Sequence, residues 1–157
     1  MIDEILKNKK LEFRTEFESE TTKIKKQLHY FSVINMIDAI LTIKNKRVSK
    51  PYKENICNYI DTVINIDLPI DKLTSLELFN RYLFSTSKYL MYKSDFTSNT
   101  DFQRTIIFGI LIDLIFSWIL ITNLGFYFPI FSIILTYKGY KKKKKNIKDK
   151  KYFNVNY

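Results

Sequence analysis

Apolar residues along the first 93 positions recur at the spacing of amphipathic helices. Over residues 3–46 they are separated by three, four or seven positions, which predicts one long helix or two helices in series. This stripe consists of Leu6, Phe13, Phe17, Ile24, Leu28 and Phe31. Charged residues occupy the other faces, so the stripe is expected to face a bundle core.

Two prolines divide the remainder of this region. Pro51 predicts a helix boundary near Ser49 or Lys50. A second helix is then expected from Tyr52 to Asn65, with an inner face of Ile56, Tyr59, Ile60 and Val63. Pro69 suits the first turn of a third helix that runs to about Tyr92. Its inward residues are predicted to be Leu73, Leu76, Phe79, Leu83 and Leu90.

A second pattern begins after a polar linker at residues 94–104. Residues 105–137 contain a single charged residue, Asp113. One straight helix from Arg104 to Lys138 would be about 50 Å long, which exceeds the roughly 30 Å apolar core of a bilayer. Turn-forming residues cluster only at 122–129. The pattern therefore predicts a transmembrane helical hairpin, and a buried hairpin in a soluble core is the alternative.

The fold class expected from these patterns is all-α, with a small cytoplasmic helical bundle followed by a C-terminal transmembrane hairpin. The expected domains are a sensor and oligomerisation domain at 1–93, the linker at 94–104, the hairpin at 105–137 and a lysine-rich cytoplasmic tail at 138–157. The N-terminus lacks the apolar core of a signal peptide. Basic residues at both ends of the hairpin predict a multi-pass protein of the bacterial inner membrane with both termini cytoplasmic.

Small and polar residues form one stripe along the first arm of the hairpin. Thr105, Gly109, Asp113 and Ser117 recur every four positions. An ionisable residue inside a membrane span faces other helices or a water-filled path. The stripe is therefore either a packing surface with a hydrogen-bonding acid or the lining of a pore. Ser132 and Thr136 are the only polar residues of the second arm, which suggests that Asp113 needs partners from other copies of the chain.

Charge is distributed unevenly. The formal net charge is +10, and nine lysines fall within the last 20 residues. A lysine cluster directly after a membrane helix binds anionic lipid headgroups; the residues expected to do so are Lys141, Lys142, Lys143, Lys144 and Lys145. The single cysteine, Cys57, excludes an intramolecular disulfide.

A basic cluster interrupts the cytoplasmic region at residues 44–53. It contains no acid and comprises Lys44, Lys46, Arg47, Lys50 and Lys53, with Tyr52 beside them. One interpretation is a solvated loop or a contact with lipid headgroups. The other is an anion site for a nucleotide or oligonucleotide, with Tyr52 stacking on a base.

Catalytic chemistry is poorly represented. His29 is the only histidine, and the three glycines, at positions 109, 125 and 139, form no phosphate-binding loop. No zinc-protease, CxxC or nucleophile-elbow motif is present. The sequence predicts a protein that is not an enzyme and that uses no metal or cofactor.

This layout of a helical region at 1–93, a hairpin at 105–137 and a lysine-rich end resembles the small two-transmembrane channel effectors of bacterial anti-phage defence, in particular the Hailong type. The resemblance implies a homo-oligomeric, tetrameric channel. It also implies a sensor that binds an oligodeoxyadenylate made by a partner nucleotidyltransferase. Loss of this oligodeoxyadenylate would open the pore. The family's ligand residues cannot be assigned without a motif.

Three functions are thus expected to compete. The first is a ligand-gated channel or depolarising effector, which the Asp113 stripe favours. The second is a membrane-bound immunity or accessory protein. The third is a simple membrane anchor that recruits a cytoplasmic partner through the helical bundle.

Overall fold

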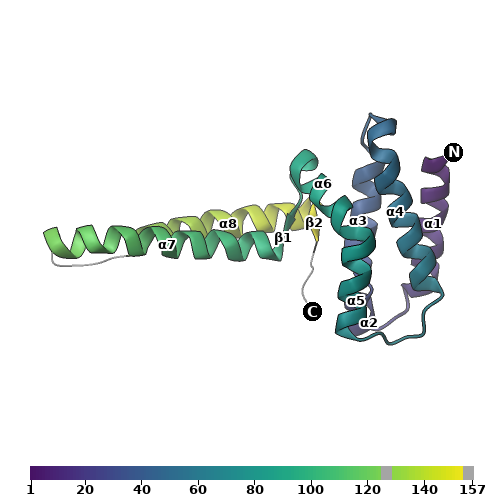
Figure 1. The fold of residues 1–157 in the computed structure, drawn as a ribbon, viewed down its shortest axis with the longest axis horizontal. Helices are drawn as coiled ribbons and strands as arrows, with labels where there is room; N and C mark the ends of the chain where they lie inside the picture. Colours follow the sequence, from purple (N-terminus) through teal and green to yellow (C-terminus); the bar gives the residue numbers. More distant parts are fainter. Residues whose placement is uncertain (125–128, 154–157) are drawn as a thin grey trace. The chain divides into compact units, whose positions relative to one another are not determined.

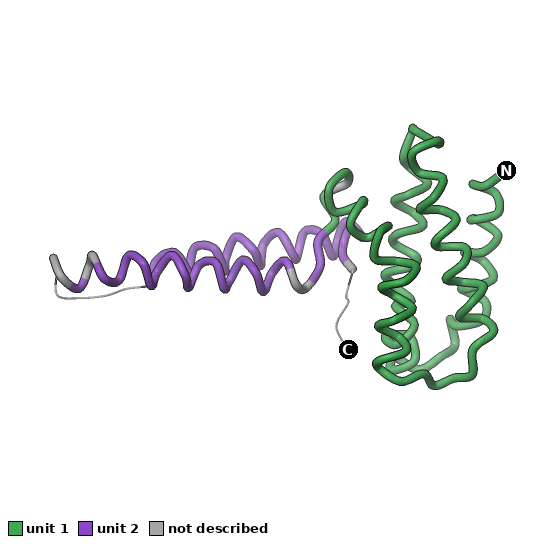
Figure 2. The backbone as a smooth tube through the Cα atoms, viewed as in Figure 1, with its two compact units in different colours: residues 1–96, 156–157 green, residues 97–155 purple. Residues whose placement is uncertain are grey.

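The computed structural model of the chain describes residues 1–124 and 129–153, and the predicted all-α character is confirmed for these residues (Figure 1). The chain divides into two compact units (Figure 2). Unit 1 contains residues 1–96, and unit 2 contains residues 97–155.

Unit 1 is a helical bundle, as predicted. Its main helices are α1, α3, α4 and α6. α3 and α4 contact each other, and each also contacts α1 and α6, while α2 and α5 are short connecting helices. A π-helical turn, η1, joins α5 to α6. The elements are α1 (Ile2–Phe17), α2 (Thr22–Gln27), α3 (Tyr30–Leu41), α4 (Lys46–Ile64), α5 (Lys72–Leu78), η1 (Phe79–Leu83) and α6 (Phe84–Ser94).

The helix boundaries are set by polar caps. Thr21 accepts a hydrogen bond from the backbone N–H of Ile24 at 3.3 Å, and Asn45 accepts one from Val48 at 3.2 Å. Side-chain oxygens at these positions satisfy donors that the first helical turn leaves unpaired. The region 3–46 therefore forms three helices rather than one or two, and the boundary predicted near Ser49 is wrong because α4 already starts at Lys46 and contains Pro51.

The core of unit 1 follows the predicted stripes in part. Ile56, Tyr59, Ile60 and Val63 are all fully buried, which confirms the inner face of the second predicted helix. The Tyr59 hydroxyl donates a buried hydrogen bond of 2.8 Å to the carbonyl oxygen of Leu28. Phe31, Leu73 and Leu76, however, are 64%, 69% and 38% exposed, so their predicted core positions are wrong.

Unit 2 is an antiparallel pair of helices closed at one end by a short β-pair (Figure 1). α7 (Asn99–Leu124) packs along α8 (Ile130–Lys148). β1 (Thr97–Ser98) precedes α7 and pairs in parallel with β2 (Tyr152–Phe153), with Thr97 opposite Tyr152. We refer to α7 and α8 together as the hairpin.

The closed end of the hairpin is held by side-chain hydrogen bonds. Asp101 accepts hydrogen bonds from the backbone N–H and the hydroxyl of Ser98, at 2.7 and 3.0 Å. The buried amide of Asn146 donates to the Thr97 hydroxyl at 2.9 Å. These contacts fix the start of α7 against the end of α8.

The hairpin corrects the predicted transmembrane segment. Within residues 1–124 and 129–153, no helix has the length and apolar character needed to cross a membrane. α8 has 19 residues, and every 18-residue stretch of it contains Lys138 and the lysine run at 141–145. The predicted C-terminal transmembrane hairpin is therefore not supported by the structure.

Candidate functional site

Asp113 lies on α7 and contacts the first turn of α8. Its side chain is only 2% exposed. One carboxylate oxygen accepts a hydrogen bond from the backbone N–H of Phe131 at 3.0 Å, and the other accepts one from Ser132 at 2.6 Å. Pro129, the N-cap residue of α8, makes no side-chain capping bond. Asp113 therefore supplies from the neighbouring helix the cap that the local sequence lacks.

The electrostatics of this contact favour an ionised carboxylate. Burial alone raises the pKa of Asp113, but hydrogen bonds from Ser132 and Phe131 outweigh that effect and hold the pKa below its usual value. The positive end of the α8 macrodipole acts in the same direction. The expectation that two helices leave Asp113 short of partners is wrong, because the partners are backbone N–H groups.

Close approach of the helices makes this contact possible. A Cβ atom on Gly109 would lie 2.9 Å from the Cα atom of Ser132. Thr105, Gly109, Asp113 and Ser117 are buried or half-buried along the side of α7 that meets α8, whereas Ile107, Leu111 and Ile115 are exposed. Gly109 and Asp113 of the small-residue stripe thus contact α8 of the same chain, whereas the packing interpretation expected partners from other copies of the chain.

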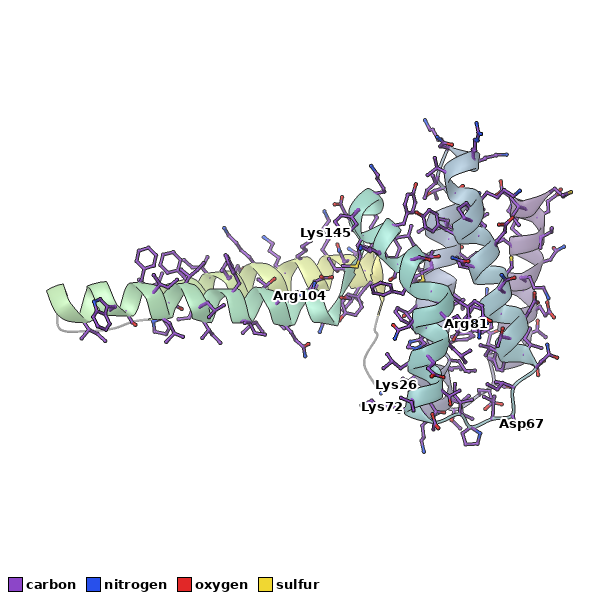
Figure 3. The ribbon with its side chains drawn as sticks, viewed as in Figure 1. Lys26, Asp67, Lys72, Arg81, Arg104 and Lys145 are labelled. Carbon is purple, nitrogen blue, oxygen red and sulfur yellow. The ribbon has the colours of Figure 1, made fainter. Side chains whose placement is uncertain are left out.

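The lysine run belongs to α8 rather than to an extended tail. Lys143 is half-buried, and its ammonium group lies 5.2 Å from the ring centroid of Phe102 and 5.5 Å from that of Tyr152. Lys141, Lys142, Lys144 and Lys145 are exposed. Figure 3 shows Lys145 on α8 and Arg104 on α7 at the same end of the hairpin.

The remaining surface of the hairpin is rich in exposed apolar side chains, many of which Figure 3 shows along both helices. Those on α7 are Ile107, Phe108, Ile110, Leu111, Leu114, Ile115, Phe116, Trp118 and Ile121. Those on α8 include Ile130, Phe131, Ile133, Ile134, Tyr137 and Tyr140. These residues surround each helix except on the side where the two helices meet.

The basic cluster at residues 44–53 is partly used inside unit 1. The Lys53 ammonium is fully buried and pairs with the Asp3 carboxylate at 2.6 Å. This hydrogen bond lowers the pKa of Asp3, and Lys46, at 3.6 Å, adds to the effect. The Tyr52 ring stacks on Tyr89 with centroids 4.3 Å apart.

The other members of the cluster occupy the surface near the start of α4. Lys44, Lys46, Arg47 and Lys50 are exposed, and Lys50 forms an i,i+4 pair with Glu54 at 3.7 Å. Four of the six predicted anion-binding side chains are therefore exposed, and two of these, Lys46 and Lys50, also pair with acidic residues of unit 1. Lys53 is buried in its pair with Asp3, and the Tyr52 ring is stacked on Tyr89.

His29 and Cys57 of unit 1 both pack against other residues of the helical bundle. His29 precedes α3 with a left-handed backbone (φ 48°), and its ring lies 4.8 Å from that of Phe79. Cys57 is buried, and burial raises the pKa of its thiol. Among the described residues, no group of three or more His, Cys, Asp or Glu side chains could hold a metal ion.

The chain matches no protein-family model, no curated protein and no solved structure. The resemblance to the Hailong-type effectors therefore stays a prediction.

Proposed function

We propose that this protein binds anionic lipid membranes through the hairpin and carries the helical bundle of unit 1 as a cargo or recruitment domain. The role is one of binding rather than catalysis. The observation that carries the proposal is the exposed apolar surface of α7 and α8, which continues into the exposed lysines at the end of α8.

The apolar surface is too extensive to be left in water. Leu111, Leu114, Ile115 and Trp118, on α7, are between 52% and 78% exposed. Fully removing one leucine or isoleucine side chain from water contributes about 1.5–3 kcal/mol. Contiguous apolar patches of this kind mark interaction sites with proteins or membranes. Contact with a membrane surface would remove part of this apolar area from water.

The lysines select a negatively charged lipid surface. From Lys138 to Lys148, α8 contains no acidic residue, and Lys141, Lys142, Lys144 and Lys145 are exposed. Each lysine near an anionic membrane contributes about 1 kcal/mol of binding free energy. Tyr137 and Tyr140 lie between the apolar part and the lysines, which is the position amphipathic aromatic residues take at a membrane interface.

Vesicle flotation of the full chain tests the proposal. Wild type should float with vesicles of phosphatidylcholine and phosphatidylglycerol, and only weakly with phosphatidylcholine alone. Changing Lys141, Lys142, Lys144 and Lys145 to glutamine should weaken binding roughly 100-fold or more at low salt, given about 1 kcal/mol per lysine. A matched control changes four exposed lysines of unit 1, Lys7, Lys23, Lys26 and Lys72, and should float like wild type.

Two results would contradict the proposal. Equal loss of flotation in the control variant would show a general charge effect. Assembly into large lipid-free oligomers that do not float would show that other copies of the chain cover the apolar surface, as in the predicted homo-oligomer.

A further inference from the structure

An open groove runs along one side of the hairpin. It has a volume of about 470 Å³ and is lined by Phe102, Ser132, Ile133, Thr136, Tyr137 and Tyr140. This volume falls within the roughly 300–1,000 Å³ of small-ligand sites. The lining is mainly apolar and aromatic, and its hydroxyl groups belong to Ser132, Thr136, Tyr137 and Tyr140.

Gly139 shapes one end of the groove. A Cβ atom there would lie 3.1 Å from Cδ2 of Phe102, so the missing side chain lets the Phe102 ring lie directly against α8. The Lys143 ammonium then lies 5.2 Å from the centroid of the same ring. A positive charge is thereby held at the end of an apolar groove.

Helix periodicity places further lysines beyond that end. Ile133, Tyr137 and Lys141 follow one another at four-residue steps, and so do Thr136, Tyr140 and Lys144. Lys141 and Lys144 are exposed and lie one turn past the last groove residues on α8. The order along this face is thus apolar, aromatic and then cationic, which matches the order of acyl chain, interface and phosphate in a phospholipid.

We propose that this groove holds one acyl chain of an anionic phospholipid, with the lipid phosphate at Lys141 and Lys144. The inference rests on the proposed membrane binding and adds to it a specific lipid subsite. The bound lipid would fix which side of the hairpin faces the bilayer.

Photo-cross-linking tests the subsite in the full chain. Vesicles of phosphatidylcholine and phosphatidylglycerol contain a trace of phosphatidylglycerol with a diazirine in one acyl chain, and cross-linked residues are mapped by mass spectrometry. Cross-links should concentrate on the groove residues. Thr136→Trp or Ile133→Trp, which fills the groove, should lower them by about tenfold, equivalent to about 1.4 kcal/mol. Leu11→Trp, at an exposed position of α1 in unit 1, is the matched control and should leave them unchanged.

The outcomes separate the two proposals. If wild type floats but the cross-links spread evenly over the exposed residues of both helices, or if both groove-filling variants cross-link like wild type, the subsite is wrong and membrane binding stands. If wild type does not float, the proposed function itself fails. Replacing the probe with a phosphatidylcholine analogue should lower groove cross-linking. Equal labelling by both probes would show that Lys141 and Lys144 do not select an anionic headgroup.

Discussion

The carboxylate of Asp113 accepts a hydrogen bond of 2.6 Å from the backbone N–H of Ser132, 19 residues further along the chain. Phe131 donates a second bond to the same side chain. A single acid on α7 thus satisfies two of the N–H groups that the first turn of α8 would otherwise leave unpaired. The acid holds the two arms of the hairpin in register.

Replacing Asp113 should loosen the start of α8. Asp113→Leu removes both acceptors, so the amides of Phe131 and Ser132 should exchange with solvent roughly tenfold faster or more. Asp113→Asn retains one amide oxygen and should produce a smaller effect. Hydrogen exchange of the hairpin measures both variants, with Ser117→Ala as a control because the Ser117 hydroxyl donates to the Leu114 carbonyl on its own helix. Unchanged exchange in Asp113→Leu would show that solvent replaces the cap.

The same contact should be sensitive to acid. The pKa of Asp113 in the folded protein lies below its ordinary value, so the contact stabilises the fold fully at neutral pH. Stability is lost as the pH falls from the ordinary value near 4 through the lower, folded pKa. The pKa values of Asp3 and Asp71 are also lowered, so the acid-induced loss has several sources. The difference in urea unfolding between wild type and Asp113→Asn isolates the Asp113 part, and this difference should shrink below pH 4.

The two described glycines of the hairpin should respond differently to alanine. At Gly109 the new methyl group would meet the Ser132 backbone at 2.9 Å, whereas at Gly139 it would meet the Phe102 side chain at 3.1 Å. Backbone cannot rotate away, so Gly109→Ala should cost about 1–3 kcal/mol of stability, the usual range for overpacking. Gly139→Ala should cost less, because the Phe102 side chain can shift by a few tenths of an ångström, and the gain of up to about 1 kcal/mol in helix propensity applies at both positions. Thermal unfolding measures both, and the reverse order would contradict the close approach of Gly109 to the Ser132 backbone.

The pair of Asp3 and Lys53 provides a test in unit 1. Asp3→Ala leaves the fully buried Lys53 ammonium without its 2.6 Å partner, which is strongly unfavourable. Lys53→Met removes the buried charge and keeps much of the side-chain volume, so it should lower the melting temperature less. Lys50→Ala, which affects only an exposed pair with Glu54, is the control and should shift the melting temperature little. A smaller loss in Asp3→Ala than in Lys53→Met would show that water already solvates Lys53.

Anion binding by the exposed part of the basic cluster stays a prediction. Reversing the charges of Lys46, Arg47 and Lys50 should weaken binding of a short single-stranded oligonucleotide, and wild-type binding should fall steeply with salt. Reversing Lys23, Lys26 and Lys72, which are also exposed, matches the change in net charge elsewhere in unit 1. Equal loss of affinity in both variants would show that the oligonucleotide is attracted only by net charge. Unchanged affinity in the Lys46, Arg47 and Lys50 variant would show that the cluster is a solvated surface.

The sequence by itself determined the helical class, the bundle before an apolar segment and much of the core of unit 1. Ile56, Tyr59, Ile60 and Val63 could be placed correctly because the burial of one helix face is a local, periodic property. Three apolar stripe positions, Phe31, Leu73 and Leu76, were placed wrongly, because periodicity within one segment does not say which positions a neighbouring helix covers.

The tertiary structure alone decided what the charged residues contact. The partners of Asp113 are backbone N–H groups, which every residue except proline carries, so they cannot be identified from residue types. The one sequence signal for this contact was Pro129, which offers no capping side chain at the start of α8. In the sequence, Lys53 cannot be distinguished from its neighbours in the basic cluster. It is nevertheless buried, because α1 places Asp3, 50 positions earlier in the chain, beside it. Such pairings depend on which helices meet, and helix spacing within one segment does not contain that information.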